Sequence, residues 1–280
     1  VSLSPNAPKL YDANGNLNWE NSTWTNPLAV LRRKYYNATD NFIANTTIGF
    51  EVIKNLRIKS NFGYTSMTVN EIGTNPISSF DPQYASLLEG YSNFGDGKVQ
   101  TWIAEPVMDY NISIGKGQLT FLAGGTFQQS SQENKSIEAY GYTSDALLEN
   151  LGAASTILVT SNDASVYKYT AAFARLNYNG NEKYILNLTA RRDGSSRFGP
   201  GNQFANFGAV GVAWLFSRES FMKNVSFLSF GKLRASYGST GSDAIGNYQY
   251  LEAFSTTRYP YGGSGGLALN RLANPDYSWE

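Results

Sequence analysis

Apolar and polar residues alternate with a period of two along most of this 280-residue chain, and this alternation constrains the fold more than any other feature. Between residues 42 and 52, Phe42, Ile48 and Phe50 fall on one face of an extended chain, and Glu51 falls on the other. Because successive side chains of a strand point to opposite faces, the pattern predicts a sheet with one apolar and one polar face. Several runs are far longer than the roughly 5–6 residues typical of strands in soluble sheets. This length favours an antiparallel transmembrane β-barrel over a soluble sandwich or propeller.

The alternating runs predict about nine or ten strands separated by connections of two kinds. The expected strands cover residues 28–36, 42–52, 56–69, 99–114, 119–142, 166–178, 184–191, 204–216, 228–239 and 248–254. Short connections at 53–55, 115–117 and 179–182 alternate with long ones at 71–97, 143–164 and 193–203. Outer-membrane barrels have short periplasmic turns and long extracellular loops, so the order of connections fits that class.

Two local features add detail to the expected barrel. Pro106 lies inside an alternating run, and because proline cannot donate to a sheet ladder we expect a bulge or a local break there. Rings gather near the short turns, where an aromatic girdle at the periplasmic membrane surface would lie. These rings are Phe50, Tyr110, Tyr178, Tyr184 and Trp214.

The composition agrees with strands that expose rings to something other than water. Charged residues make up 16% of the chain and aromatic residues 14%, whereas a typical soluble domain is about 25% charged. The mean hydropathy of -0.34 is compatible with a barrel, because alternation hides the apolar residues in the average. Lys and Arg number 22, as do Asp and Glu, and this balance argues against a nucleic-acid partner.

The same composition argues against most enzyme chemistry. The chain has no Cys and no His, which removes thiolate nucleophiles, Ser-His-Asp catalysis and the commonest metal ligands. Glu105 and Asp109 share a strand face, but four residues of strand separate them by roughly 13 Å. Glycosidase carboxylates are about 5–9.5 Å apart. We therefore expect no enzyme, no metal and no cofactor.

Three motifs resemble the barrel of the SusC-like TonB-dependent transporters. They read RRDGSSRFGPGNQFANFGAVGVAW at 191–214, KLRASYGSTGSDAIGNYQYL at 232–251 and LANPDYSWE at 272–280. The motif residues, which we expect to be structural, are Arg191, Asp193, Gly194, Ser195, Ser196, Arg197, Phe198, Gly199, Lys232, Arg234, Tyr237, Gly238, Gly241 and Trp279. The chain departs from the family pattern at Leu215, Ser242 and Tyr277.

The resemblance implies a fold, a location and a set of partners. It implies that residues 1–280 are a partial β-barrel domain from the outer membrane of a Gram-negative bacterium, in contact with its lipid. The family's barrel has 22 strands, and the plug domain, the TonB box and the C-terminal strands are expected to be absent here. It also implies import of a glycan or peptide, powered by TonB through those absent segments. A SusD-like surface lipoprotein would cover the barrel.

Aromatic and basic side chains of the expected long loops are candidates for contact with that substrate. They are Trp19, Trp24, Tyr84, Tyr91, Arg197, Tyr259 and Tyr261. The alternative is that the loop rings pack within their own loops. Residues 191–197 have two readings as well, either a phosphate- or sugar-binding loop or a folded loop in which Asp193 and Arg197 or Arg191 pair while Gly194 permits a tight turn.

A second class of protein stays open from the sequence. A soluble all-β carbohydrate-binding module would fold compactly in plain buffer and bind sugars through its loop rings. A barrel fragment would instead expose unpaired strand edges, so we expect it to aggregate or to depend on detergent.

Overall fold

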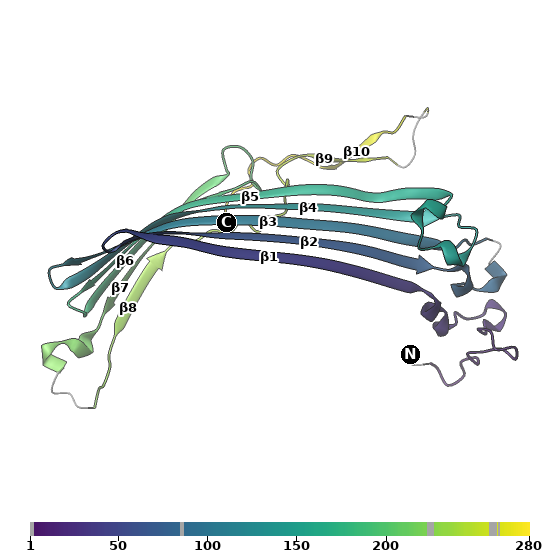
Figure 1. Ribbon diagram of the computed structural model, residues 1–280, viewed down its shortest axis with the longest axis horizontal. Helices are drawn as coiled ribbons and strands as arrows, with labels where there is room; N and C mark the ends of the chain where they lie inside the picture. The colour runs from purple at the N-terminus through teal and green to yellow at the C-terminus, as the bar shows by residue number, and fades with distance from the viewer. Residues whose placement is uncertain (1–2, 85–86, 223–226, 258–261, 263) are drawn as a thin grey trace. The chain divides into compact units, whose positions relative to one another are not determined.

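The computed structural model describes residues 3–84, 87–222, 227–257, 262 and 264–280, and these residues form an all-β protein (Figure 1). Eight strands lie side by side in chain order in one sheet. They are β1 (Lys34–Ile53), β2 (Leu56–Asn75), β3 (Tyr91–Ile114), β4 (Gly117–Tyr140), β5 (Thr156–Gly180), β6 (Tyr184–Ser195), β7 (Phe204–Trp214) and β8 (Leu233–Gly238). A separate hairpin pairs β9 (Ala253–Thr256) with β10 (Leu267–Arg271). The predicted antiparallel fold class is confirmed.

Short 3-10 helices occupy the connections. They are η1 (Glu20–Ser22), η2 (Pro27–Arg32), η3 (Ile77–Ser79), η4 (Pro82–Tyr84), η5 (Asp145–Leu147), η6 (Leu151–Ala153), η7 (Phe216–Arg218) and η8 (Ser220–Met222). None of the helices in the described residues is both long enough and apolar enough to cross a membrane.

Contacts divide the chain into two compact units. The first comprises residues 1–42, 66–100 and 132–165, and the second comprises 43–65, 101–131 and 166–280. The first unit therefore holds most of the long connections, and the second holds the short turns together with β6, β7 and β8.

The register of the second unit gives the sheet two chemically distinct faces. Leu188 of β6 lies between Leu176 of β5 and Val210 of β7, and Tyr237 of β8 continues this apolar row. One residue along, Asn187 lies opposite Asn177, and the Nδ2 of Asn177 donates to the Oδ1 of Asn187 over 2.6 Å. The alternation in the sequence thus becomes a real separation of an apolar face from a polar face.

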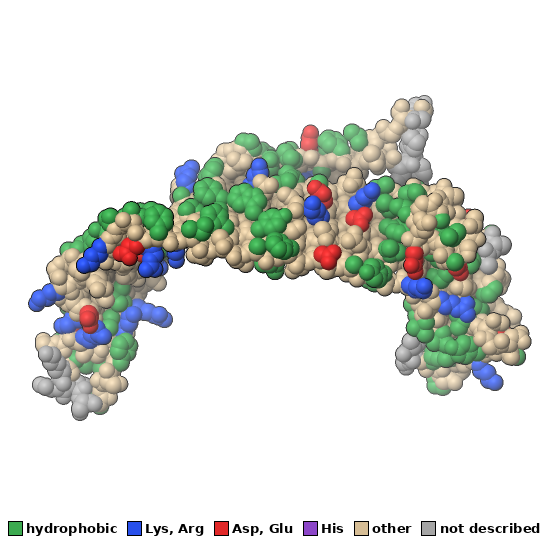
Figure 2. All heavy atoms as spheres, in the orientation of Figure 1, with side chains coloured by type: hydrophobic (Ala, Val, Ile, Leu, Met, Phe, Trp, Pro, Cys, Tyr) green, Lys and Arg blue, Asp and Glu red, His purple; other side chains and the backbone are tan. Residues whose placement is uncertain are grey.

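The apolar face does not enclose a core. Large strand side chains are exposed to solvent, for example Ile48 at 62% and Phe50 at 58%, and Figure 2 shows hydrophobic side chains spread over the visible surface. Few large apolar side chains in the described residues are buried, and these lie mostly in connections. A soluble sandwich would cover such a face with a second sheet, so the exposure favours a lipid-facing wall.

Several predicted boundaries were wrong because strands run further than the alternation does. β2 continues to Asn75 and β3 begins at Tyr91, so the connection expected at 71–97 is shorter. β5 begins at Thr156, inside the connection expected at 143–164. Where both faces of a strand contact water, neither face needs apolar residues. The alternation with a period of two therefore disappears from the sequence.

Other expectations were corrected by local chemistry. Residues 28–36 do not begin as a strand, because Pro27 starts η2 and the Asn26 side chain accepts from the Leu28 amide over 2.9 Å, which caps it. β3 continues through Pro106 without the local break that was one of the two outcomes expected there. The strand expected at 228–239 is shortened to β8, and in place of the strand expected at 248–254 β9 begins only at Ala253 and ends at Thr256.

The connection between β7 and β8 is long although it lies at the end of the sheet where the short turns are. One carboxylate ties it down: Glu219 accepts from the Nζ of Lys183 (2.8 Å), the hydroxyl of Tyr184 (2.6 Å) and the Nε1 of Trp214 (3.1 Å). These three donors, the Lys183 ammonium above all, lower the pKa of Glu219 from 4.5 to about 2. Two rings of the predicted periplasmic girdle, Tyr184 and Trp214, are therefore held together at this end.

Candidate functional site

The long connections of the first unit are locked to one another by hydrogen bonds. Asp145 accepts from the amide of Ile77 over 2.8 Å and from the amide of Ser78 over 3.4 Å, which joins the β4–β5 connection to the β2–β3 connection. The hydroxyl of Ser92 donates to the carbonyl of Leu148 over 2.6 Å. These contacts fix the connections as one platform.

An aromatic stack extends the platform. The guanidinium of Arg33 lies 5.5 Å from the ring centre of Phe80, which stacks on Tyr91 at 6.4 Å. Tyr91 in turn stacks on Tyr140 at 5.6 Å. The predicted candidate Tyr91 therefore belongs to a ring stack, as the alternative of packing within the loops expected.

A groove of about 600 Å³ opens between residues 12–22 and residues 77–83, of which only the second segment belongs to the platform. Trp19 lines it, together with polar side chains from both segments. Asp12 stays charged there, because the backbone amide of Asn16 donates to it over 2.8 Å and lowers its pKa. Trp19 is the one predicted substrate-facing ring of the described residues that lines this groove.

The other candidates of the first unit lie elsewhere. Trp24 supports its own loop, since its Nε1 donates to the carbonyl of Asn18 over 3.1 Å. Tyr84 is exposed but is not part of the groove lining. The candidates Tyr259 and Tyr261 lie outside the described residues.

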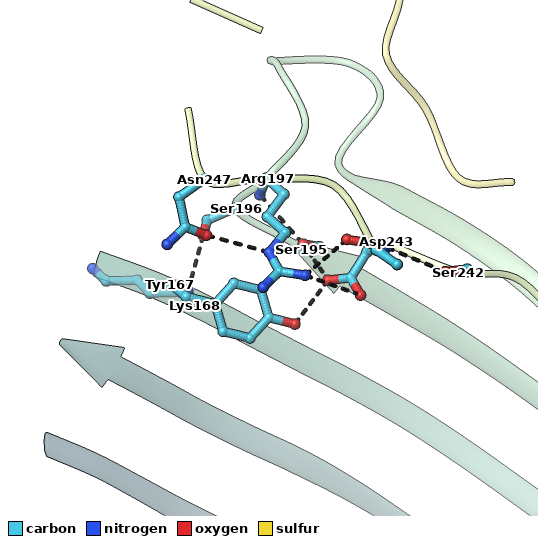
Figure 3. A network of polar contacts seen from close by, with 9 residues as sticks. Tyr167, Lys168, Ser195, Ser196, Arg197, Ser242, Asp243 and Asn247 are labelled. Carbon is cyan, nitrogen blue, oxygen red and sulfur yellow. Dashed lines mark hydrogen bonds and ion pairs between the residues drawn. The ribbon is translucent and has the colours of Figure 1, made fainter. Parts of the chain in front are cut away.

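Arg197 is the centre of a polar cluster in the second unit (Figure 3). Its guanidinium lies 4.4 Å from the ring centre of Tyr167, and its Nη1 donates to the carbonyl of Asp243 over 2.9 Å. Its Nε donates to the Oδ1 of Asn247 over 3.2 Å. The Oδ2 of Asp243 accepts from the hydroxyls of Tyr167 and Ser195, both at 2.7 Å. With its Nε and Nη1 both bonded within the chain, Arg197 acts as a structural clamp.

Neighbouring contacts fasten the same segments to β5. The Ser196 amide donates to the carbonyl of Lys168, and the Lys168 amide donates to the hydroxyl of Ser196, both over 2.9 Å. The hydroxyl of Tyr248 accepts from the amide of Val166 over 2.9 Å and donates to the carbonyl of the same residue over 3.3 Å. Residues 242–248 are thus pinned to β5 beyond the point where β6 ends.

The third motif closes this arrangement, which we call the motif junction (residues 191–203, 238–250 and 274–280). Phe198 is fully buried and lies 5.4 Å from the ring of Trp279. The Nε1 of Trp279 donates to the carbonyl of Gln203 over 3.0 Å. Ser242 and Glu280 exchange backbone hydrogen bonds of 2.8 and 3.2 Å. Three motifs that are distant in sequence therefore meet in space.

The motif residues Arg191 and Asp193 are paired, as one of the two sequence readings expected. The Nε of Arg191 donates to the Oδ1 of Asp193 over 2.5 Å, and its Nη2 donates to the hydroxyl of Tyr169 over 2.5 Å. The expected role of Gly194 was wrong, because it lies inside β6 and not in a turn. A methyl group there would overlap the ring of Phe204, so glycine is required by a close approach.

The remaining motif residues lie on or beside β8. Arg234 pairs with Ala213 on the polar face, and Tyr237 pairs with Val210 on the apolar face. Gly238 and Gly241 allow close packing, since a methyl group would overlap Ala209 or the ring of Phe207. Lys232 directly precedes the strand.

Sequence reasoning missed the partners of these motif residues. Tyr167, Asp243 and Tyr248 were not among the candidates, although Asp243 directly follows the GSTGS sequence of the second motif. In the described residues, no group of three or more Asp or Glu side chains is arranged to hold a metal ion.

Similar proteins cover nearly the whole chain. TonB-dependent receptor P26 of Formosa agariphila is 32% identical over 298 residues, which span 100% of this chain and 29% of that receptor. The TonB-dependent receptor SusC of Bacteroides thetaiotaomicron is 29% identical and is matched over 91% of this chain and 26% of its own length. No protein-family model matches the chain.

A solved structure described as the RagAB peptide transporter has the same fold. It superposes with a TM-score of 0.84 at 25% identity, over 96% of this chain and 31% of that chain. The long, two-faced antiparallel sheet is thus that of a TonB-dependent receptor barrel. The chain belongs to the SusC-like TonB-dependent receptors, and it spans less than a third of the length of these relatives.

Proposed function

We propose that this chain forms wall and extracellular loops of an outer-membrane importer that takes up a glycan or a peptide with energy from TonB. The observation that carries the proposal is the two-faced sheet: an apolar face with exposed large side chains, opposite a face that carries Asn177, Asn187 and Thr189. In a membrane, such a sheet presents the apolar face to lipid and the polar face to an aqueous lumen.

The same geometry sets the orientation that we propose for the sheet. The turns at 54–55, 115–116 and 181–183 would lie in the periplasm, and the motif junction and the locked platform would face the cell exterior. Loops tied by side-chain hydrogen bonds suit a surface that must hold one shape while substrate arrives.

Partners and location are part of the proposal. A surface lipoprotein like SusD would cover the extracellular loops, and TonB would act on segments outside residues 1–280. Residues 1–280 would belong to one barrel domain in the outer membrane of a Gram-negative bacterium. We propose no enzymatic activity and no cofactor.

The first experiment separates the barrel from a soluble carbohydrate-binding module. The chain is refolded with and without detergent, and its size is measured by sedimentation. We expect a uniform species only in detergent, because the exposed apolar face and the strand edges need cover. A compact monomer in plain buffer would instead support the soluble module.

The second experiment tests import in cells. The complete reading frame that contains the chain is deleted, and growth is measured on single glycans and on peptides as the carbon source. We expect loss of growth on one substrate class, with the same loss on deletion of TonB. Unchanged growth on every substrate that the parent strain uses would contradict the proposal.

A further inference from the structure

We propose that the groove between residues 12–22 and 77–83 binds a neutral, polyhydroxylated ligand, such as one unit of an uncharged oligosaccharide. The inference rests on the proposed importer function and narrows its substrate. The groove encloses about 600 Å³, which is within the roughly 300–1,000 Å³ of small-ligand sites.

Trp19 supplies the flat apolar surface of the site. It lines the groove, and no ring or guanidinium among the described residues stacks on its indole. Among the described residues its Nε1 has no hydrogen-bond acceptor, whereas the Nε1 of Trp24 donates to the carbonyl of Asn18. A sugar ring has an apolar face of C–H groups and a rim of hydroxyls, so it can stack on the indole and accept from the Nε1.

Polar side chains on both walls offer acceptors and donors. The Oε2 of Glu20 accepts from the Nδ2 of Asn18 over 3.0 Å, and the Oδ1 of Asp81 accepts from the amide of Gln83 over 3.0 Å. Each carboxylate keeps its second oxygen for a ligand. The side-chain amides of Asn21 and Gln83 line the groove and can both donate and accept.

The charges of the groove select against ionic ligands. Asp12, Glu20 and Asp81 line it against one cation, Arg32, whose Nη1 donates to the carbonyl of Ser78 over 2.8 Å. The excess of carboxylates repels uronates and sulfated sugars. An ammonium group would satisfy the carboxylates but accepts no hydrogen bond, so the amides and the Trp19 indole would stay unpaired. Hydroxyls both donate and accept, and they fit the whole set.

The groove is held in shape before a ligand arrives. Glu20, Asn21 and Ser22 have positive φ angles of 47°, 55° and 64°, a run that side chains rarely adopt and that the surroundings must enforce. The Nδ2 of Asn26 fastens the chain just before this run, because it donates to the carbonyls of Leu10 (2.6 Å) and Asn18 (2.9 Å). A fixed site binds without first ordering its loops.

Direct binding tests the site independently of transport. The chain in detergent is titrated with maltohexaose, cellohexaose, xylohexaose and mannohexaose, and separately with hexagalacturonate and tri-lysine. We expect at least one neutral oligosaccharide to bind and both ionic probes to fail. Trp19→Ala should weaken that binding by about tenfold or more, and Trp19→Phe should restore most of it, because stacking needs only a ring.

Tyr84→Ala is the matched control, since it removes an exposed ring that follows Gln83 in the chain but does not line the groove, and it should leave binding unchanged. The site is refuted if no neutral oligosaccharide binds, if Trp19→Ala has no effect, or if an ionic probe binds more tightly through Trp19. Oligosaccharide binding without import in cells would keep the site and remove the transport proposal. Import in cells that is unchanged by Trp19→Ala would keep the transport proposal and remove the site.

Discussion

The ring of Trp279 lies 5.4 Å from the ring of Phe198, and this contact joins the last motif of the chain to the loop between β6 and β7. Phe207 of β7 also contacts Trp279, with the ring centres 5.6 Å apart. The three rings form the apolar part of the motif junction, and Arg197 and Asp243 supply polar contacts of the same junction.

Phe198→Ala should lower the free energy of unfolding by about 3–5 kcal/mol, because it removes a fully buried ring and leaves a cavity. Denaturant unfolding in detergent, followed by the fluorescence of Trp279 and its neighbours, measures the change. Phe227→Ala is the control, since Phe227 is 90% exposed and should matter little. Equal effects of the two substitutions would show that the junction contributes nothing special.

Gly194→Ala should destabilise the chain by about 1–3 kcal/mol, because the new methyl group overlaps the ring of Phe204. Gly265→Ala is the matched control, as the surroundings of Gly265 leave open space. Thermal unfolding compares the two variants. Adding Phe204→Leu to Gly194→Ala should recover part of the loss, and failure to do so would point to a backbone requirement instead of the ring.

Glu219 should make stability sensitive to acid. Its pKa is lowered in the folded chain to about 2, so its contribution is complete above the ordinary value of 4.5 and is lost as the pH falls towards 2. Unfolding measured between pH 7 and pH 2 should show this loss in the parent chain, and Glu219→Gln should reduce it. Glu252→Gln is the control, since Glu252 is an exposed carboxylate in the connection that precedes β9, and it should leave the acid dependence as it was.

Arg197→Lys should loosen residues 242–248, because a lysine cannot bridge Asn247, the Asp243 carbonyl and the Tyr167 ring together. We expect amide hydrogen exchange of this segment to become about tenfold faster or more. Arg192→Lys is the control, since Arg192 lies over Phe204 and is exposed. Unchanged exchange in Arg197→Lys would contradict the clamp.

The sequence predicted the strands of the sheet far better than the connections between them. Period-two alternation locates β6 and β7 because one face is apolar and the other is polar, so each side chain identifies its face. The first residues of β5 carry no such signal, since TILVTSNDAS is polar or apolar without a strict period. The end of a strand was therefore missed where the two faces of that strand have the same environment.

The candidate site was predictable in kind but not in detail. The motifs identified Arg197 and Trp279, yet nothing in local sequence pairs Arg197 with Asp243 or places Asp145 beneath Ile77. Such contacts depend on how connections fold over one another, which propensities do not encode. Among the loop rings, composition alone could not separate Trp19, which lines a groove, from Tyr91, which is stacked between two other rings.

The hydroxyl of Tyr248 meets both the amide and the carbonyl of Val166, so one side chain substitutes for a missing neighbouring strand where β5 outlasts β6. Neighbouring strands can therefore end at different heights while the backbone groups of Val166 stay hydrogen-bonded. Insertions and deletions beyond Tyr248 need not disturb the strand order below. The connections that follow can therefore change in sequence while the register between β5 and β6 is kept.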